Sequence, residues 1–223
     1  MSLVARLWHG LNRVTSPFGD LCCGVLFERS LVDPLPMATT SIDVALRQAT
    51  EADVGEICRL YSTDPWLYLG EAHGPAGNDV AARALYIDRL RRGELCFLAI
   101  SDGEIADVNW VCSTWGDALP GNPIRLNSGE VYTTDALTPE RFRGKGLHAM
   151  VLRAMLEHAR MRGNSQAYTL ARLDRSASHK GLFQLGWREC GRIIYFLPRG
   201  RDRPWFLWRR GNLEPLFRPS GAG

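Results

Sequence analysis

The sequence predicts an α/β fold, because strand-like and helix-like segments alternate along its 223 residues. Two features carry this prediction. Residues 94–101 and 104–113 are rich in apolar side chains and flank Asp102-Gly103, a strong short-range signal for a β-hairpin. Residues 130–136 favour a strand through their β-branched and aromatic side chains, and a glycine-rich turn then leads into residues 147–160, whose apolar side chains recur at helical spacing.

The composition is that of a soluble globular protein, with 45% hydrophobic and 23% charged residues. The formal net charge of +3 is too small to indicate a nucleic-acid partner, and we expect none. Arginines are concentrated near the C-terminus, where such a run is usually a solvated face but could also meet an anionic substrate or a lipid surface. They are Arg188, Arg192, Arg199, Arg201, Arg203, Arg209, Arg210 and Arg218.

The six cysteines are scattered, and none has the Cys-x-x-Cys or Cys/His spacing of a metal site. We therefore expect reduced, buried thiols and no bound metal. No apolar run reaches the ~20 residues of a membrane span, and the first residues lack the apolar core and cleavage site of a secretory signal. We expect a cytoplasmic protein without membrane contact.

The N-terminal part of the chain predicts elements that precede the main domain. Residues 2–14 place five apolar side chains on one helical face, which indicates an amphipathic helix that packs on the domain or on a second subunit. A homodimer is therefore one option, and a peripheral membrane anchor is the weaker interpretation. Residues 24–31 allow an extra strand, and residues 33–41 predict a linker. The expected division is an N-terminal segment (1–41), a core domain (42–210) and a C-terminal tail (211–223).

The core domain opens with a predicted strand and two helices. Residues 42–48 alternate apolar and polar side chains, as in a half-buried strand. Residues 50–53, Thr-Glu-Ala-Asp, start a helix in the manner of a capping box. Residues 64–78 are rich in glycine and aromatic residues, and residues 80–91 predict the second helix.

The later part of the domain predicts further strands. Residues 114–128 contain several glycines and prolines and predict a loop. Residues 166–173 predict a strand after the central helix, and residues 187–197 and 204–209 predict two closing antiparallel strands.

The turn before the central helix has the features of an anion site. Gly144 and Gly146 leave backbone N–H groups uncovered at the start of the helix, where the first N–H groups lack internal partners and the helix dipole favours negative charge. Arg141, Arg143 and Lys145 add positive charge around this turn. Together these features predict a site for a phosphate-sized anion.

The pattern Arg141-x-x-Gly144-x-Gly146 between a strand and an amphipathic helix resembles the acetyl-CoA signature of the GNAT acetyltransferases. The opening at 42–53 and the segment 174–187 are also similar to that family, and the resemblance covers about residues 42–208. A P-loop would need a hydroxyl residue after Gly-Lys, and a Rossmann loop would need Gly-x-Gly-x-x-Gly early in the chain. The resemblance implies an α/β fold with a mixed, mostly antiparallel sheet and helices on both faces.

The resemblance also implies how acetyl-CoA, as the acyl-donor substrate, is held. The loop holds the CoA pyrophosphate, the preceding strand diverges from its neighbour, and a backbone N–H near Ala136 or Leu137 polarises the acetyl carbonyl. The residues assigned to the loop are Arg141, Phe142, Arg143, Gly144, Lys145, Gly146 and Leu147, and Asp174 and Ser178 join them from the later segment.

The acceptor side carries the substrate candidates Trp66, Tyr68 and Tyr132. In the family, the helix-loop-helix region around residues 64–78 covers the acceptor pocket, although Trp66 and Tyr68 fit a hydrophobic lid equally well.

The proton-transfer groups are hypotheses. An amine acceptor is mostly protonated at neutral pH, so a base helps. Glu130 stands where some GNAT members carry a catalytic glutamate, and Asp135 competes because it is nearer the expected acetyl position. Purely structural roles for both carboxylates are an equal alternative.

The general acid departs from the family pattern. The family's tyrosine, four residues before the late glycine, is replaced by Leu182. Ser178, His179 and Tyr132 are alternative donors, or the thiolate leaves without a protein proton.

These observations predict an acetyl-CoA-dependent N-acetyltransferase that acts on a small amine, with an amino sugar as one candidate. Two alternatives stay open. One is an acyltransferase that uses a longer acyl-CoA or a hydroxyl acceptor. The other is a non-catalytic acyl-CoA-binding or scaffolding module, which the missing tyrosine motivates.

Overall fold

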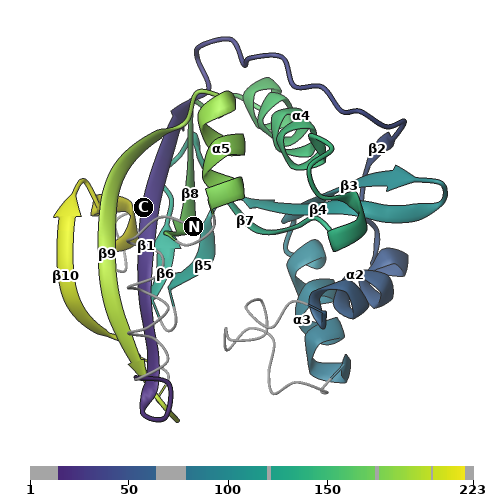
Figure 1. Ribbon diagram of the computed structural model, residues 1–223. Coiled ribbons are helices and arrows are strands. Elements are labelled where there is room, and N and C mark those ends of the chain that lie inside the picture. Colours follow the sequence, from purple (N-terminus) through teal and green to yellow (C-terminus); the bar gives the residue numbers. More distant parts are fainter. Residues whose placement is uncertain (1–14, 64–78, 120–121, 174–175, 202, 219–223) are drawn as a thin grey trace.

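A computed structural model describes residues 15–63, 79–119, 122–173, 176–201 and 203–218 (Figure 1). The predicted α/β fold is confirmed, with helices on both faces of a mostly antiparallel sheet. The strands are β1 (Gly19–Ser30), β2 (Ala45–Gln48), β3 (Leu95–Ser101), β4 (Glu104–Cys112), β5 (Trp115–Leu119), β6 (Asn122–Arg125), β7 (Glu130–Leu137), β8 (Gln166–Arg172), β9 (Arg188–Pro198) and β10 (Trp205–Gly211). The helices are α2 (Val54–Tyr61), α3 (Asp79–Arg91), α4 (Leu147–Met161) and α5 (Ser176–Gln184), with short 3-10 turns η1 (Glu51–Asp53), η3 (Glu140–Phe142) and η4 (Glu214–Leu216).

The main sheet has eight strands in the order β10-β9-β1-β8-β7-β4-β3-β2. Neighbouring strands pair antiparallel except β7 and β8, which pair parallel in the middle of the sheet. Strand β1 comes from the segment before residue 42 and lies between β8 and β9, so this part of the chain supplies an inner strand. The helix α4 forms the crossover between β7 and β8, as parallel pairing of consecutive strands requires.

Local signals in the sequence are matched by local structure. Asp102 and Gly103 join β3 to β4 with φ values of +51° and +79°, the backbone that a tight hairpin turn needs. At residues 50–53 the expected capping box is present, and within it the Thr50 N–H donates to the Asp53 carboxylate over 2.8 Å.

The prediction of a loop over residues 114–128 is wrong in part, because β5 and β6 form a small two-stranded sheet there. Its glycines and prolines suggested irregular structure. However, Leu119 and Ile124 are 3% and 0% exposed, and they pack in a cluster with residues of β1, β9 and η4. Burial of these side chains outweighs the turn propensity of their neighbours.

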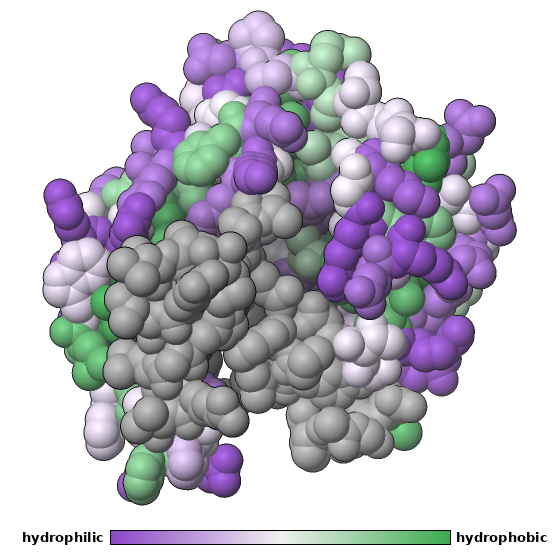
Figure 2. Space-filling view, viewed as in Figure 1, coloured by the Kyte–Doolittle hydropathy of each residue, from purple (hydrophilic) through white to green (hydrophobic). Residues whose placement is uncertain are grey.

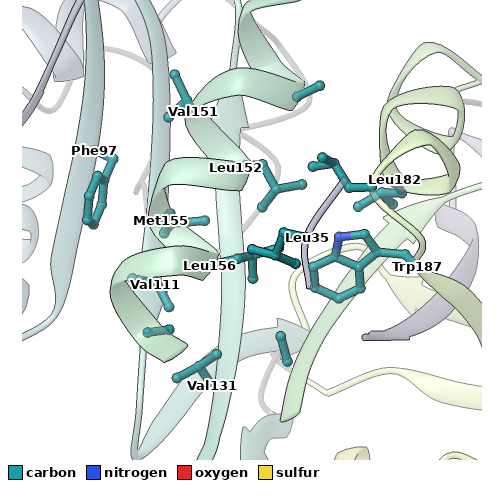
Figure 3. Packing of buried hydrophobic residues seen from close by; sticks show 14 of the residues in the cluster. Leu35, Phe97, Val111, Val131, Val151, Leu152, Met155, Leu156, Leu182 and Trp187 are labelled. Carbon is teal, nitrogen blue, oxygen red and sulfur yellow. The ribbon is translucent and has the colours of Figure 1, made fainter. Parts of the chain in front are cut away.

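The hydrophobic core lies on both faces of the sheet. On one face, Val151, Leu152, Met155 and Leu156 of α4 belong to one buried cluster, and Figure 3 shows Leu156 on the side of the helix that faces Leu35 and Trp187. On the other face, α2 and α3 cover a second cluster centred on β3 and β4. This packing fixes the position of α4, whose first turn borders the candidate site.

None of the described helices is long and apolar enough to cross a membrane. All six cysteines lie among the described residues, none of them forms a disulfide bond there, and five of them are buried.

Candidate functional site

The candidate site is a cleft that opens where β7 and β8 diverge. The parallel ladder runs from Glu130/Gln166 to Thr133/Thr169 and then stops, while both strands continue. The Thr169 hydroxyl donates to the Thr133 carbonyl over 2.9 Å, which closes the apex of the divergence. Beyond this point the cleft has a volume of about 720 Å³ and is lined by β7, β8, α4, α5 and the loop before α4.

The loop between η3 and α4 has the backbone of an anion site. Gly144 and Gly146 have φ values of +77° and +82°, which L side chains rarely adopt. The first hydrogen bond of α4 runs from the Met150 N–H to the Gly146 carbonyl over 3.2 Å, and no side chain of the described residues caps the helix. The N–H groups of the first turn are therefore left for a ligand, and the helix dipole favours an anion there.

One side of this loop is open and the other is packed. A Cβ atom placed on Gly144 would meet no other atom within 4 Å. A Cβ on Gly146 would lie 2.3 Å from the Thr39 carbonyl oxygen, and the Ser41 N–H donates to the Lys145 carbonyl over 3.1 Å. The segment before β2 thus supports the loop from behind, and Gly144 faces the open side.

The three cations of the loop are used differently. Arg143 lines the cleft, and its Nε donates to the Thr138 carbonyl over 3.1 Å. Arg141 is ion-paired with Glu104 and lies over the Phe142 ring at 4.9 Å, and Lys145 lies 5.4 Å from the same ring. Hydrophilic side chains dominate the visible surface around this loop (Figure 2). Arg143 is therefore the loop cation best placed to face a bound anion.

Comparison with solved structures agrees with this architecture. The chain is similar to a proposed acetyltransferase of the GNAT family from Novosphingobium aromaticivorans, with a TM-score of 0.54 and 15% identity over 79% of this chain and 63% of that chain. It is similar to the ribosomal-protein-alanine N-acetyltransferase from Brucella melitensis, with a TM-score of 0.55 and 18% identity over 75% of this chain and 99% of that chain. It also resembles yncA, a proposed acetyltransferase from Salmonella typhimurium solved with its cofactor acetyl-CoA, with a TM-score of 0.51 and 17% identity over 76% and 94% of the two chains.

The chain has the GNAT fold. No protein-family model and no curated protein matches its sequence. The chain spans less than two thirds of the Novosphingobium structure, at 63% of its length.

The cleft brings together many of the residues predicted for a GNAT cofactor site. The predicted cofactor and acceptor residues that line it are Ala136, Leu137, Phe142, Arg143, Gly144, Gly146, Leu147, Ser178 and Tyr132. Arg141 and Lys145 do not line it. Trp66, Tyr68 and Asp174 lie outside the described residues.

The two base candidates lie at opposite ends of β7. Asp135 lines the cleft, and its carboxylate accepts a hydrogen bond from Arg89 over 2.5 Å. Glu130 does not line the cleft and is ion-paired with Arg218, whose Nη2 donates to it over 3.0 Å. The geometry therefore disfavours Glu130 as a direct base, and its catalytic role stays a prediction.

At the expected general-acid position, Leu182 is 2% exposed and lines the cleft. Of the alternative donors, Ser178 and Tyr132 line the cleft, whereas the His179 Nε2 lies 2.9 Å from the Arg172 carbonyl oxygen and His179 does not line it. Burial raises the pKa of the Tyr132 hydroxyl above its usual range, so this group holds its proton.

Sequence analysis missed a polar cluster under the start of α4. Asn109 and His148 line the cleft, and the Asn109 amide donates to the buried Asp107 carboxyl over 2.6 Å. Burial lowers the pKa of His148 to about 4, so its ring is neutral near pH 7. The signal in the sequence is Asp107 and Asn109 at alternate positions of an otherwise apolar strand, since buried polar groups need a reason.

Proposed function

We propose that the chain is an acetyl-CoA-dependent N-acetyltransferase that acts on the amine of a small acceptor. The observation that carries this proposal is the cleft between β7 and β8, which ends at the uncapped start of α4 beside the open face of Gly144. The N–H groups at an uncapped helix start can bind a diphosphate, and the open space beside Gly144 lets such a group come close to the backbone. An amino sugar is one candidate acceptor, and the fold alone does not select among small amines.

The residues of the cleft suggest how the donor is held. Arg143 and the N–H groups around Gly144 and Gly146 would face the CoA diphosphate, and the pantetheine arm would follow β7 into the divergence. Ala136 and Leu137 line the cleft at the far end of β7. A backbone N–H there would donate to the thioester carbonyl oxygen, where negative charge develops during attack.

The reaction itself needs no covalent group from the protein. The neutral amine nitrogen attacks the thioester carbonyl carbon, an N–C bond forms, and the C–S bond breaks to release the CoA thiolate. The amine proton leaves to a base or to water, and the thiolate takes up a proton from Ser178, Tyr132 or water. Glu130 and Asp135 are the base hypotheses, with their positions as given above.

Calorimetric titration of the protein with acetyl-CoA tests the binding step. We expect a measurable affinity that falls at least ~10-fold in Gly144→Leu, because the added side chain occupies the space through which the diphosphate approaches the backbone. Gly163→Leu is a matched control, since Gly163 has a φ of +85° and, like Gly144, nothing within 4 Å of an added Cβ, and it does not line the cleft. Absence of any heat with wild-type protein would remove the proposal.

A second candidate is a non-catalytic acyl-CoA-binding module. The apolar Leu182 at the expected general-acid position favours it, because no hydroxyl is present there. Release of CoA in the presence of a panel of small amines separates the two. Turnover of any amine supports the enzyme, and tight acetyl-CoA binding without turnover of the whole panel supports the binding module. The same assay with longer acyl-CoA donors and hydroxyl acceptors tests the related acyltransferase.

A further inference from the structure

Strand β7 is irregular at Asp135. Its pairing with β4 shifts register between Thr134 and Leu137, so that three steps on β7 oppose two steps on β4. This is the pattern of a β-bulge, which re-aims the backbone locally. Asp135 has a φ of +50°, in the left-handed region where a non-glycine residue is strained. Such a conformation persists only where the surrounding contacts hold it.

Contacts from two helices hold Asp135 in this conformation. The Arg89 Nη1 of α3 donates to the Asp135 carboxylate over 2.5 Å, and the Tyr61 hydroxyl of α2 donates to the Asp135 carbonyl over 2.5 Å. Arg89 and Tyr61 are 5% and 2% exposed. Two buried side chains therefore hold Asp135, Arg89 at its carboxylate and Tyr61 at its backbone carbonyl. Both come from helices on the face of the sheet opposite α4.

Arg89 is itself held from several sides. Its Nε donates to Glu94 over 2.8 Å, and its guanidinium lies 4.3 Å from the centre of the Trp110 ring. Burial disfavours the charge of Arg89, but the carboxylates of Asp135 and Glu94 outweigh this and raise its pKa further above its usual value. The Arg89 guanidinium is thus held in place, stays charged, and links α3 to the bulge.

Ala136 is part of the bulge, because it lies with Asp135 between the paired residues Thr134 and Leu137, and it lines the cleft. We infer that Arg89 is a positioning residue that acts through Asp135: it holds the bulge so that the Ala136 N–H faces the thioester carbonyl. This inference rests on the proposed function and assigns Asp135 a positioning role in place of a base. Arg89 does not line the cleft, so its effect on the reaction must pass through the backbone of β7.

The infrared carbonyl stretch of bound acetyl-CoA, labelled with ¹³C at the acetyl carbonyl, reports this contact directly. A hydrogen bond to the carbonyl oxygen lowers the stretching frequency, and the measurement needs no acceptor. We expect a downshift in the wild-type complex, at least half of which is lost in Arg89→Met, while the affinity for acetyl-CoA stays within ~2-fold because the diphosphate loop is elsewhere. With any amine that the wild type turns over, kcat should fall by roughly 10- to 100-fold.

Arg218→Met is the matched control. Arg218 is also an almost buried arginine, with an 8% exposed side chain, and it pairs with a carboxylate of the same strand, but away from the cleft. It should keep the wild-type carbonyl frequency, although it too loses a buried ion pair. Arg89→Lys keeps the charge but cannot donate to Asp135 and Glu94 in the same fork. It provides a readout if Arg89→Met does not fold, and it should lose part of the downshift.

The outcomes separate the inference from the proposed function. A wild-type protein that does not bind acetyl-CoA would remove the proposed function, and this inference with it. Binding with a carbonyl frequency that is the same in wild type, Arg89→Lys and Arg89→Met would overturn the inference alone. A loss of the downshift in Arg218→Met equal to that in Arg89→Met would also overturn it, because the effect would then reflect general loosening of the fold.

Discussion

The two ends of strand β7 carry the same kind of ion pair in different settings. At the cleft end, Arg89 bridges Asp135 and Glu94, and the side chains of these two carboxylates are 18% and 10% exposed. At the other end, Arg218 bridges Glu130 and Glu214, and the Glu214 side chain is 59% exposed. Arg89 thus lies between two largely buried carboxylates, whereas one of the two carboxylate partners of Arg218 is exposed to solvent.

The comparison shows that the same kind of arginine–carboxylate ion pair has two different structural roles in this protein. Arg218 comes from the end of the chain and also donates to the Arg125 carbonyl over 2.9 Å, so it fastens the C-terminal segment to β6 and β7. Arg89 fastens no terminus. It holds a bulge that borders the cleft. Under the proposed function, the position of a carboxylate relative to the cleft, and not its ion pair, would decide whether the carboxylate affects the reaction.

The largest expected effect is on stability. Arg89→Met leaves two carboxylates in a largely buried site without their cation, so we expect a loss of about 3–5 kcal/mol in the free energy of unfolding. Arg218→Met leaves Glu214 able to remain hydrated, so we expect a smaller loss, roughly 1–3 kcal/mol. Urea denaturation of the two variants and wild type measures both values.

The triple variant Arg89→Met, Asp135→Asn, Glu94→Gln controls for the cause of that loss. It removes the uncompensated charges, so it should regain part of the stability lost in Arg89→Met. Two results would contradict this expectation: equal losses of unfolding free energy in Arg89→Met and Arg218→Met, or no recovery of stability in the triple variant. Either would show that the solvent exposure of the carboxylates does not set the strength of the ion pairs at the two ends of β7.

A third carboxyl, Asp107 on β4, shows what burial does without a cation. It is 0% exposed and its hydrogen-bond donors are Thr138 and Asn109. Burial raises its pKa to about 8, so the folded state keeps a proton that the unfolded chain releases near its usual value of 3.8. Its contribution to stability is therefore present below about pH 4 and is lost as the pH rises toward about 8, by up to ~1.4 kcal/mol per pH unit.

Asp107→Asn tests this sign. The amide has nearly the same shape and no titration, so the stability of the wild type relative to the variant should fall steadily between pH 5 and about pH 8. Urea denaturation at several pH values measures the difference. A difference that is independent of pH would mean that Asp107 is ionised in the folded protein across this range.

Kinetics sharpen the comparison between Asp135 and Glu130. With an amine that the protein acetylates, Asp135→Asn should lower kcat by roughly 10-fold, because the neutral amide holds Arg89 less firmly and the bulge loosens. Glu130→Gln should leave kcat within ~2-fold and the pH–rate profile unchanged, since Glu130 lies outside the cleft. Loss of the acidic limb of the profile in Glu130→Gln, which reports the ionisation of an essential base, would restore Glu130 as the base.

The sequence predicts features whose determinants are local. The Asp102-Gly103 turn, the glycines before α4 and the apolar stripe of that helix each occupy a short stretch, and each is found where it was predicted. Contacts between residues that are far apart in the chain cannot be predicted from such local patterns. Arg89 and Asp135 are 46 residues apart, and Arg218 and Glu130 are 88 apart.

The placement of β1 between β8 and β9 is another consequence of distant pairing. An apolar run indicates a strand, but periodicity does not say which neighbours it joins. The sequence does not show these long-range contacts, so the roles of the two carboxylates of β7 could only be stated as alternatives from it.

The smallest expected effect concerns the ion pair of Arg47 and Asp53, where the Arg47 side chain is 45% exposed. Arg47 donates to Asp53 over 2.6 and 2.8 Å, and this contact is the first cause that lowers the pKa of Asp53 to about 2. The contribution is present above about pH 4 and is lost as the pH falls toward about 2. Water and salt screen such a pair, so a double-mutant cycle of Arg47→Met and Asp53→Asn should give a coupling of only about 0.2–1 kcal/mol, which decreases in 1 M salt. A coupling as large as that of Arg89 with Asp135 would contradict the premise of the comparison, that burial of the partners sets the strength of these arginine pairs.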